Sequence, residues 1–100
     1  MIELEDAVME IIVNAGQSRS LCFEALHAAR TGNIDEARLL LNEAHGYARR
    51  AHQMQTQLIE QDAGEARQPM TLIMVHAQDH LMNSLLAREF SEELIHLYQR

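Results

Sequence analysis

Four polar side chains that could take part in chemistry stand close together within an otherwise apolar part of the chain. Residues 75–81 read Val-His-Ala-Gln-Asp-His-Leu, and Asp79 is their only formally charged member at neutral pH. At about 100° per residue in a helix, Asp79 and His80 lie on either side of His76, one turn further on. The spacing therefore predicts that these three groups form one polar patch, with Gln78 on the adjoining side.

Asp79 also interrupts an apolar seam with helical spacing. The other members of the seam are Leu72, Val75, Met82 and Leu86. A carboxylate in such a seam is costly to bury unless it is paired, protonated or bound to a cation. Packing alone favours leucine at this position, so the aspartate indicates that something is bound or specified there.

The spacing leaves three interpretations open. His76 could accept a phosphoryl group on a ring nitrogen, because a neutral imidazole has a free lone pair and is available near neutral pH. His76, Asp79 and His80 could instead bind zinc, since histidines at i and i+4 share one helix face. The same groups could form a buried polar network that fixes the register of subunits in a purely structural helical oligomer.

The elements that must position these groups are helices. The chain of 100 residues is rich in alanine, leucine, methionine, glutamate and glutamine, and it has 4% aromatic residues, one proline and four glycines. This composition favours helices over strands. The apolar periodicity predicts an all-α single domain, residues 1–100, with helices over about 3–30, 33–60 and 69–98.

Two breaks separate the predicted helices. Gly32 suits the left-handed position after the first helix, and Asn33 with Glu36 gives a capping-box pattern for the second. The stretch 62–69 forms the second break, and Pro69 is suited to the first turn of the third helix.

The third predicted helix carries apolar groups in nearly every direction. Two partner helices in an antiparallel up-down-up bundle cover only part of such a surface, because a helix that is apolar all round is buried on more than one side. The sequence therefore predicts a homo-oligomer with this helix at its centre.

Charge and hydropathy exclude several classes of partner. A formal net charge of -7 argues against nucleic acid and against an anionic membrane surface, both of which require a basic face. No apolar run is long enough to span a membrane, and the acidic start of the chain does not resemble a secretory signal. We therefore expect no membrane insertion, a cytoplasmic location, and a buried, reduced thiol at Cys22.

Three segments of the sequence, in order, resemble one known family. Residues 74–82 (Met-Val-His-Ala-Gln-Asp-His-Leu-Met) resemble the active-site segment of the lactose/cellobiose-type IIA components of the bacterial phosphoenolpyruvate:sugar phosphotransferase system. Residues 14–21 (Asn-Ala-Gly-Gln-Ser-Arg-Ser-Leu) resemble its first-helix signature, and residues 59–65 resemble its second loop. The resemblance covers essentially the whole chain and is nearer to the chitobiose/cellobiose branch.

The resemblance implies a function and an assembly. His76 would accept a phosphoryl group from the histidine-containing phosphocarrier protein and pass it to a cysteine of the IIB component, for uptake of a β-linked disaccharide such as cellobiose, chitobiose or lactose. Gln78 and His80 would support the site. Three chains would form a nine-helix bundle in which the three copies of Asp79 bind one divalent cation, expected to be magnesium.

Overall fold

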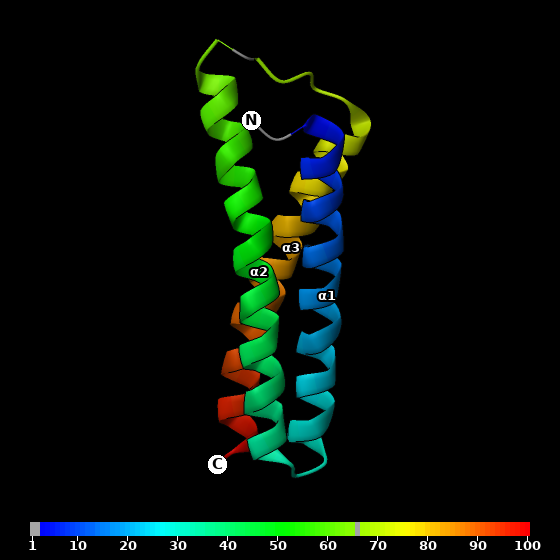
Figure 1. Cartoon of the computed structure of the whole chain (residues 1–100). Helices are drawn as coiled ribbons and strands as arrows, with labels where there is room; N and C mark the ends of the chain where they lie inside the picture. The colour runs from blue at the N-terminus through cyan, green and yellow to red at the C-terminus, as the bar shows by residue number, and fades with distance from the viewer. Residues whose placement is uncertain (1–2, 66) are drawn as a thin grey trace.

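The computed structural model describes residues 3–65 and 67–100, which form an up-down-up bundle of three long α-helices (Figure 1). The helices are α1 (Leu4–Arg30), α2 (Ile34–Ala63) and α3 (Leu72–Tyr98). The bundle is narrow, with extents of 51 × 21 × 18 Å. The predicted all-α fold is therefore confirmed for the described part of the chain.

The first junction forms one of the two hydrogen bonds of the predicted capping box, since the Asn33 backbone N–H donates to the Ala28 carbonyl oxygen at 2.8 Å instead of to Glu36. Gly32 has φ +92°, the left-handed region that favours glycine after a helix. The Asn33 side chain accepts a hydrogen bond from the Glu36 backbone N–H at 3.4 Å. The Asn33 side-chain amide also donates to the Glu36 carboxylate at 2.8 Å.

The second junction differs from the prediction at both of its ends. The second helix continues to Ala63 rather than to residue 60, and the third begins at Leu72 rather than at residue 69. Pro69 is not in the first turn, because Thr71 is the N-cap and its hydroxyl accepts a hydrogen bond from the Met74 N–H at 3.2 Å. A side-chain cap fixes a helix start more directly than the backbone preference of proline does.

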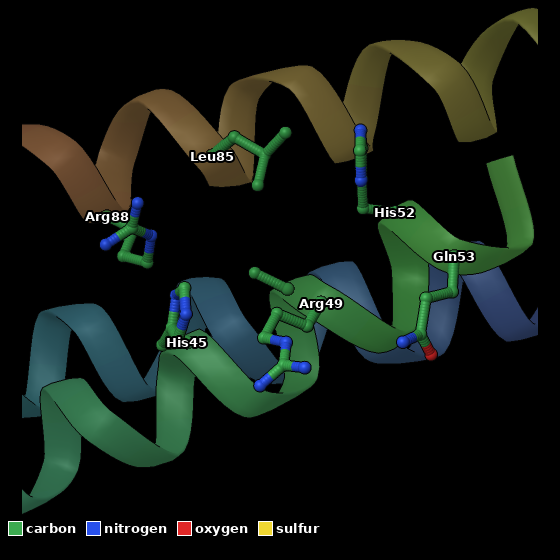
Figure 2. Close-up of a pocket in the computed structure, with 7 residues that line it drawn as sticks. His45, Arg49, His52, Gln53, Leu85 and Arg88 are labelled. Atoms are coloured by element: carbon green, nitrogen blue, oxygen red, sulfur yellow. The ribbon is translucent and has the colours of Figure 1, made fainter. Parts of the chain in front are cut away.

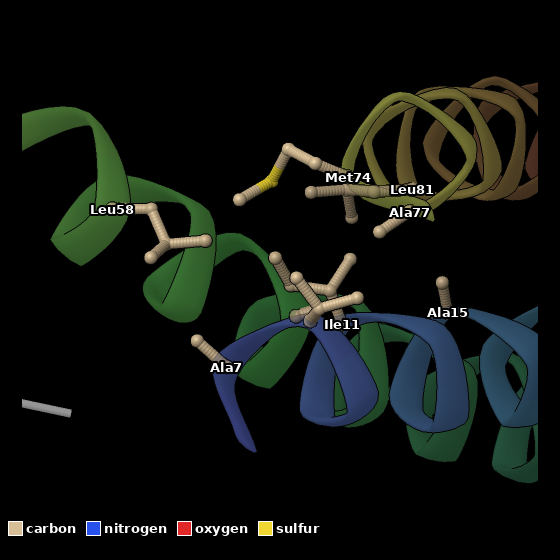
Figure 3. Packing of buried hydrophobic residues seen from close by; sticks show 9 residues of the cluster. Ala7, Ile11, Ala15, Leu58, Met74, Ala77 and Leu81 are labelled. Atoms are coloured by element: carbon tan, nitrogen blue, oxygen red, sulfur yellow. The ribbon is translucent and has the colours of Figure 1, made fainter. Parts of the chain in front are cut away.

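Small residues let α1 and α2 pack closely along their length. The alanines that are fully or almost fully buried in α1 and α2 include Ala7, Ala15, Ala25, Ala37, Ala44, Ala48 and Ala51. Ser18 is fully buried between the two helices and donates to the Ala44 carbonyl oxygen at 2.8 Å. The part of the core nearest the start of α1 contains larger side chains from all three helices. There Ile11, Leu58 and Leu81 point toward one another (Figure 3).

One side of α3 is left uncovered by its own chain. The exposed large apolar residues that share this side, here called the α3 stripe, are Leu72, Val75, Met82, Leu86, Phe90, Leu94 and Leu97. Leu72 is 86% exposed and Phe90 is 61% exposed. Contiguous apolar surface of this kind marks an interaction site in a folded protein.

We predict that Ala44→Leu destabilises the bundle, because α1 and α2 leave no room for an added isobutyl group. Overpacking of this kind costs about 1–3 kcal/mol. Chemical unfolding followed by circular dichroism measures the change. Glu43→Leu, one residue away on the exposed face, is the matched control and should stay within about 0.5 kcal/mol of wild type. Equal stability of Ala44→Leu and wild type would contradict this description of the interface.

Candidate functional site

His76 lies on the second turn of α3 and its side chain is exposed. It follows Val75 of the α3 stripe directly, and the buried Met74 and Ala77 hold the helix against the core on its other side. The imidazole is therefore carried by a rigid element while its ring is open to solvent. A group that exchanges a substituent with other proteins needs both properties.

His80 stacks on His76 one helical turn further on. The ring centroids are 5.9 Å apart and the ring planes differ by 8°. His80 is half-buried, and its Nε2 atom lies against the backbone of α1 at Gly16, where an added Cβ would come within 3.3 Å. The structure thus brings the two predicted histidines together and adds α1 to the site.

Gln78 is held on the opposite flank of α3 by α2. Its side-chain oxygen accepts a hydrogen bond from the side-chain amide of Gln55, and its amide lies 3.7 Å from the sulfur of Met74. The structure therefore places Gln78 toward α2 and His80 toward α1. Gln78 therefore lies apart from the predicted patch of His76, Asp79 and His80, as its spacing indicated.

Asp79 is exposed and stands among the members of the α3 stripe, away from its own core. Across residues 3–65 and 67–100 no three histidine, cysteine, aspartate or glutamate side chains gather as a set of metal ligands. The interpretation of His76, Asp79 and His80 as a zinc site within one chain therefore finds no support in this geometry. A site shared between chains requires only one carboxylate from each.

An apolar groove of about 320 Å³ lies beside the start of α3. It is lined by Leu58, Ile59, Asp62, Gln68, Met70, Met74, Val75 and Gln78. The Asp62 carboxylate, in the last turn of α2, accepts a hydrogen bond from the Gln68 N–H at 2.7 Å. This bond holds Gln68 against the end of α2. This groove reaches the residues next to His76.

A second groove, of about 330 Å³, lies lower between α2 and α3 (Figure 2). It is lined by His45, Arg49, His52 and Gln53 of α2, with Leu85 and Arg88 of α3 facing them. His45, Arg49 and His52 are exposed, as expected for a solvated helix face. None of the four predicted site residues lines this groove.

Comparison with known proteins identifies the family. The family model for the lactose/cellobiose-specific IIA subunit of the phosphotransferase system matches residues 6–99. The chain belongs to this family. It is therefore a IIA component of a lactose/cellobiose-type phosphotransferase system, as the three sequence segments predicted.

Two curated relatives align with nearly the whole chain. The N,N'-diacetylchitobiose-specific EIIA component of Escherichia coli (strain K12) is 47% identical over 98% of this chain and 84% of its own length. The lichenan-specific enzyme IIA component of Bacillus subtilis (strain 168) is 43% identical over 98% of this chain and 89% of its own length.

Solved structures of IIA components share the fold. The cellobiose-specific enzyme IIA of Bacillus anthracis superposes with a TM-score of 0.93 at 35% identity, covering 99% of this chain and 92% of that one. The IIA(Chitobiose) chain of a solution complex with HPr, from Escherichia coli, gives a TM-score of 0.84 at 45% identity, covering 99% and 96%.

This IIA component has no helix, within the described ranges, that is long and apolar enough to cross a membrane. Its single cysteine, Cys22, is free and buried in α1, as predicted. Burial raises the pKa of the Cys22 thiol, partly offset by a hydrogen bond with Ser91 and by the charge of Arg88. A buried thiol with a raised pKa is a poor nucleophile, so Cys22 belongs to the packing.

Sequence reasoning missed Gly16 and Gln55 as members of the site. Both come from helices other than α3, and their contacts depend on how the helices are registered against one another. Gly16 does lie inside the segment 14–21 that resembles the family signature, and a glycine in the middle of a helix is the signal that could have drawn attention to it.

We predict that diethylpyrocarbonate modifies His76 faster than His80, because the His76 ring is exposed whereas Nε2 of His80 faces the α1 backbone. Peptide mapping by mass spectrometry after short exposures measures both rates in one sample. The exposed His52 serves as an internal reference. Faster modification of His80 than of His76 would contradict the site geometry.

Proposed function

We propose that His76 is the phosphoryl carrier of this IIA component. The observation that supports this most directly is the exposed imidazole of His76, carried by a helix whose opposite side packs against the core, and stacked on His80. The donor would be a histidine-containing phosphocarrier protein, since a relative of 45% identity forms a complex with HPr. The acceptor would be a cysteine of a IIB component, and the transfer would take place in the cytoplasm.

The proposed relay consists of two displacements at phosphorus. A ring nitrogen of neutral His76 attacks the phosphoryl group on the donor histidine, a new N–P bond forms, and the old N–P bond breaks with its electron pair returning to the donor ring. The thiolate of IIB then attacks the same phosphorus, an S–P bond forms, and the pair of the breaking bond returns to His76. Positioning contributes most of the rate in such a transfer.

The α3 stripe supports assembly as a trimer. Leu72, Val75, Asp79, Met82 and Leu86 follow one another at steps of three and four, the spacing of a coiled-coil seam. Packing the stripes of three parallel copies together would cover this surface and leave His76 at the edge of each contact. A nine-helix bundle follows from three such chains.

Asp79 would then bring three carboxylates together on the axis of the trimer. Three negative charges within an apolar seam require a cation, and carboxylate oxygens suit magnesium. The ion would neutralise these charges and so stabilise the assembly. No step of the relay passes through it.

The apolar groove beside His76 supports a docking role. Met70, Met74 and Val75 present flexible and apolar side chains next to the phosphorylated position, and methionine adapts to more than one partner surface. A carrier that must contact a donor and an acceptor in turn benefits from such a surface. For the transported sugar we propose a β-linked disaccharide of the cellobiose, chitobiose or lactose type.

We predict that incubation with phosphoenolpyruvate, enzyme I and HPr adds one acid-labile phosphoryl group to each chain, and that His76→Ala abolishes the addition. Intact-mass spectrometry at neutral pH measures it. His52→Ala, a change at another exposed histidine, is the control and should be phosphorylated like wild type. A His76→Ala chain that still acquires the group would refute the proposed function.

We predict that magnesium raises the melting temperature of the wild-type trimer and has little effect on Asp79→Asn. Saturation at about 100 times the dissociation constant corresponds to about 2.7 kcal/mol. Without magnesium, Asp79→Asn should melt higher than wild type because three repelling charges are gone. Glu24→Gln removes an exposed carboxylate elsewhere and should keep the magnesium response. Equal magnesium responses of Asp79→Asn and wild type would contradict the shared site.

A further inference from the structure

Gly16 occupies the middle of α1, where glycine is unfavourable. Relative to alanine, a glycine inside a helix costs about 0.5–1 kcal/mol of stability. The adjacent position of α1 is a fully buried alanine, Ala15. Helix formation therefore gives no reason for the missing side chain at position 16.

The space beside Gly16 is taken by the ring of His80. A Cβ placed on Gly16 would lie 3.3 Å from His80 Nε2, close enough that the ring would have to yield by a few tenths of an ångström. Gly46, in the middle of α2, has nothing within 4 Å of the corresponding position. The two glycines differ in this one respect, which makes Gly46 a matched reference.

The ring of His80 also lies beside the ring of His76. The two rings are stacked with their centroids 5.9 Å apart and nearly parallel. His80 thus fills the space between the α1 backbone and the His76 ring. If the ring of His80 moves away from α1, the support on one face of the His76 ring changes.

We propose that Gly16 is a positioning residue for phosphoryl transfer: its missing side chain leaves room for the His80 ring, which in turn orients the imidazole of His76. This inference rests on the proposed phosphoryl-carrier function and extends it to α1. Gly16 itself touches neither donor nor acceptor in this account. It acts only through His80.

The expected size of the effect follows from the displacement. Misplacing a reacting group by about 1 Å costs on the order of 100-fold in rate, so a shift of a few tenths of an ångström corresponds to roughly 3- to 10-fold. Gly16→Ala should therefore slow phosphorylation of His76 by that factor. Its helix should at the same time be as stable as wild type or more so.

The test is a double-mutant cycle on the full chain. Phosphorylation rates from phosphorylated HPr are measured by rapid quench for wild type, Gly16→Ala, His80→Ala and the double variant, over a range of HPr concentrations. Gly16→Ala should lower the maximal rate in the wild-type background and have no effect in the His80→Ala background. Gly46→Ala should leave the rate unchanged.

Three kinetic outcomes would overturn the inference. Equal slowing by Gly16→Ala with and without His80 would mean that position 16 acts by another route, such as contact with HPr. A change confined to the concentration of HPr at half-maximal rate would point to docking rather than to ring orientation. A rate for Gly16→Ala equal to wild type would overturn it as well.

A second measurement needs no phosphoryl donor. In NMR spectra of the histidine rings, Gly16→Ala should shift the signals of His80 and His76, whereas Gly46→Ala should not. Unshifted ring signals would overturn the inference whatever the relay activity. Shifted rings in a protein whose wild type accepts no phosphoryl group would instead refute the proposed function, and with it the link from Gly16 to transfer.

Folding of the variants is checked by circular dichroism. If Gly16→Ala fails to fold, the double variant Gly16→Ala/His80→Ala should recover its helices. The alanine at position 80 removes the ring that the new Cβ at position 16 meets. A double variant that also fails to fold would show that the contact with His80 is not what position 16 must satisfy. That result would overturn the inference.

Discussion

The apolar surface of α3 exceeds what α1 and α2 can cover, and this imbalance governs the structure. The alanine-lined contact between α1 and α2 keeps the bundle narrow, so both helices meet α3 from one side. The remaining α3 stripe has to be covered from outside the chain. His76 lies at the edge of this stripe, where one side of the helix is anchored and the adjoining side is open.

Most of the fold could be predicted from the sequence because its determinants are local. Apolar spacing identified the helices, and the contact between Asn33 and Glu36 formed as its capping pattern indicates. The start of α3 was misplaced because Pro69 and Thr71 both suit a helix start, and in the structure the hydroxyl of Thr71 accepts the capping hydrogen bond from the Met74 N–H. Spacing alone does not rank two such signals.

The candidate site could be predicted only in part. His76 and His80 share one helix, so their proximity follows from helical geometry and the structure confirms it. The separation of Gln78 from them depends on Gln55, and the space for His80 depends on Gly16. Contacts between helices require the register of one helix against another, which one sequence does not reveal.

The stacked arrangement also bears on the three chemical interpretations. To bind one ion, His76 and His80 would have to converge with their ring nitrogens, whereas they lie nearly parallel at 5.9 Å. Asp79 belongs to the α3 stripe rather than to the flank that carries the two rings. Asp79 and His76 are one helical turn apart, so the proposed cation and the phosphoryl carrier would occupy adjoining strips of the helix surface. Because that helix is rigid, assembly around Asp79 would fix where His76 stands.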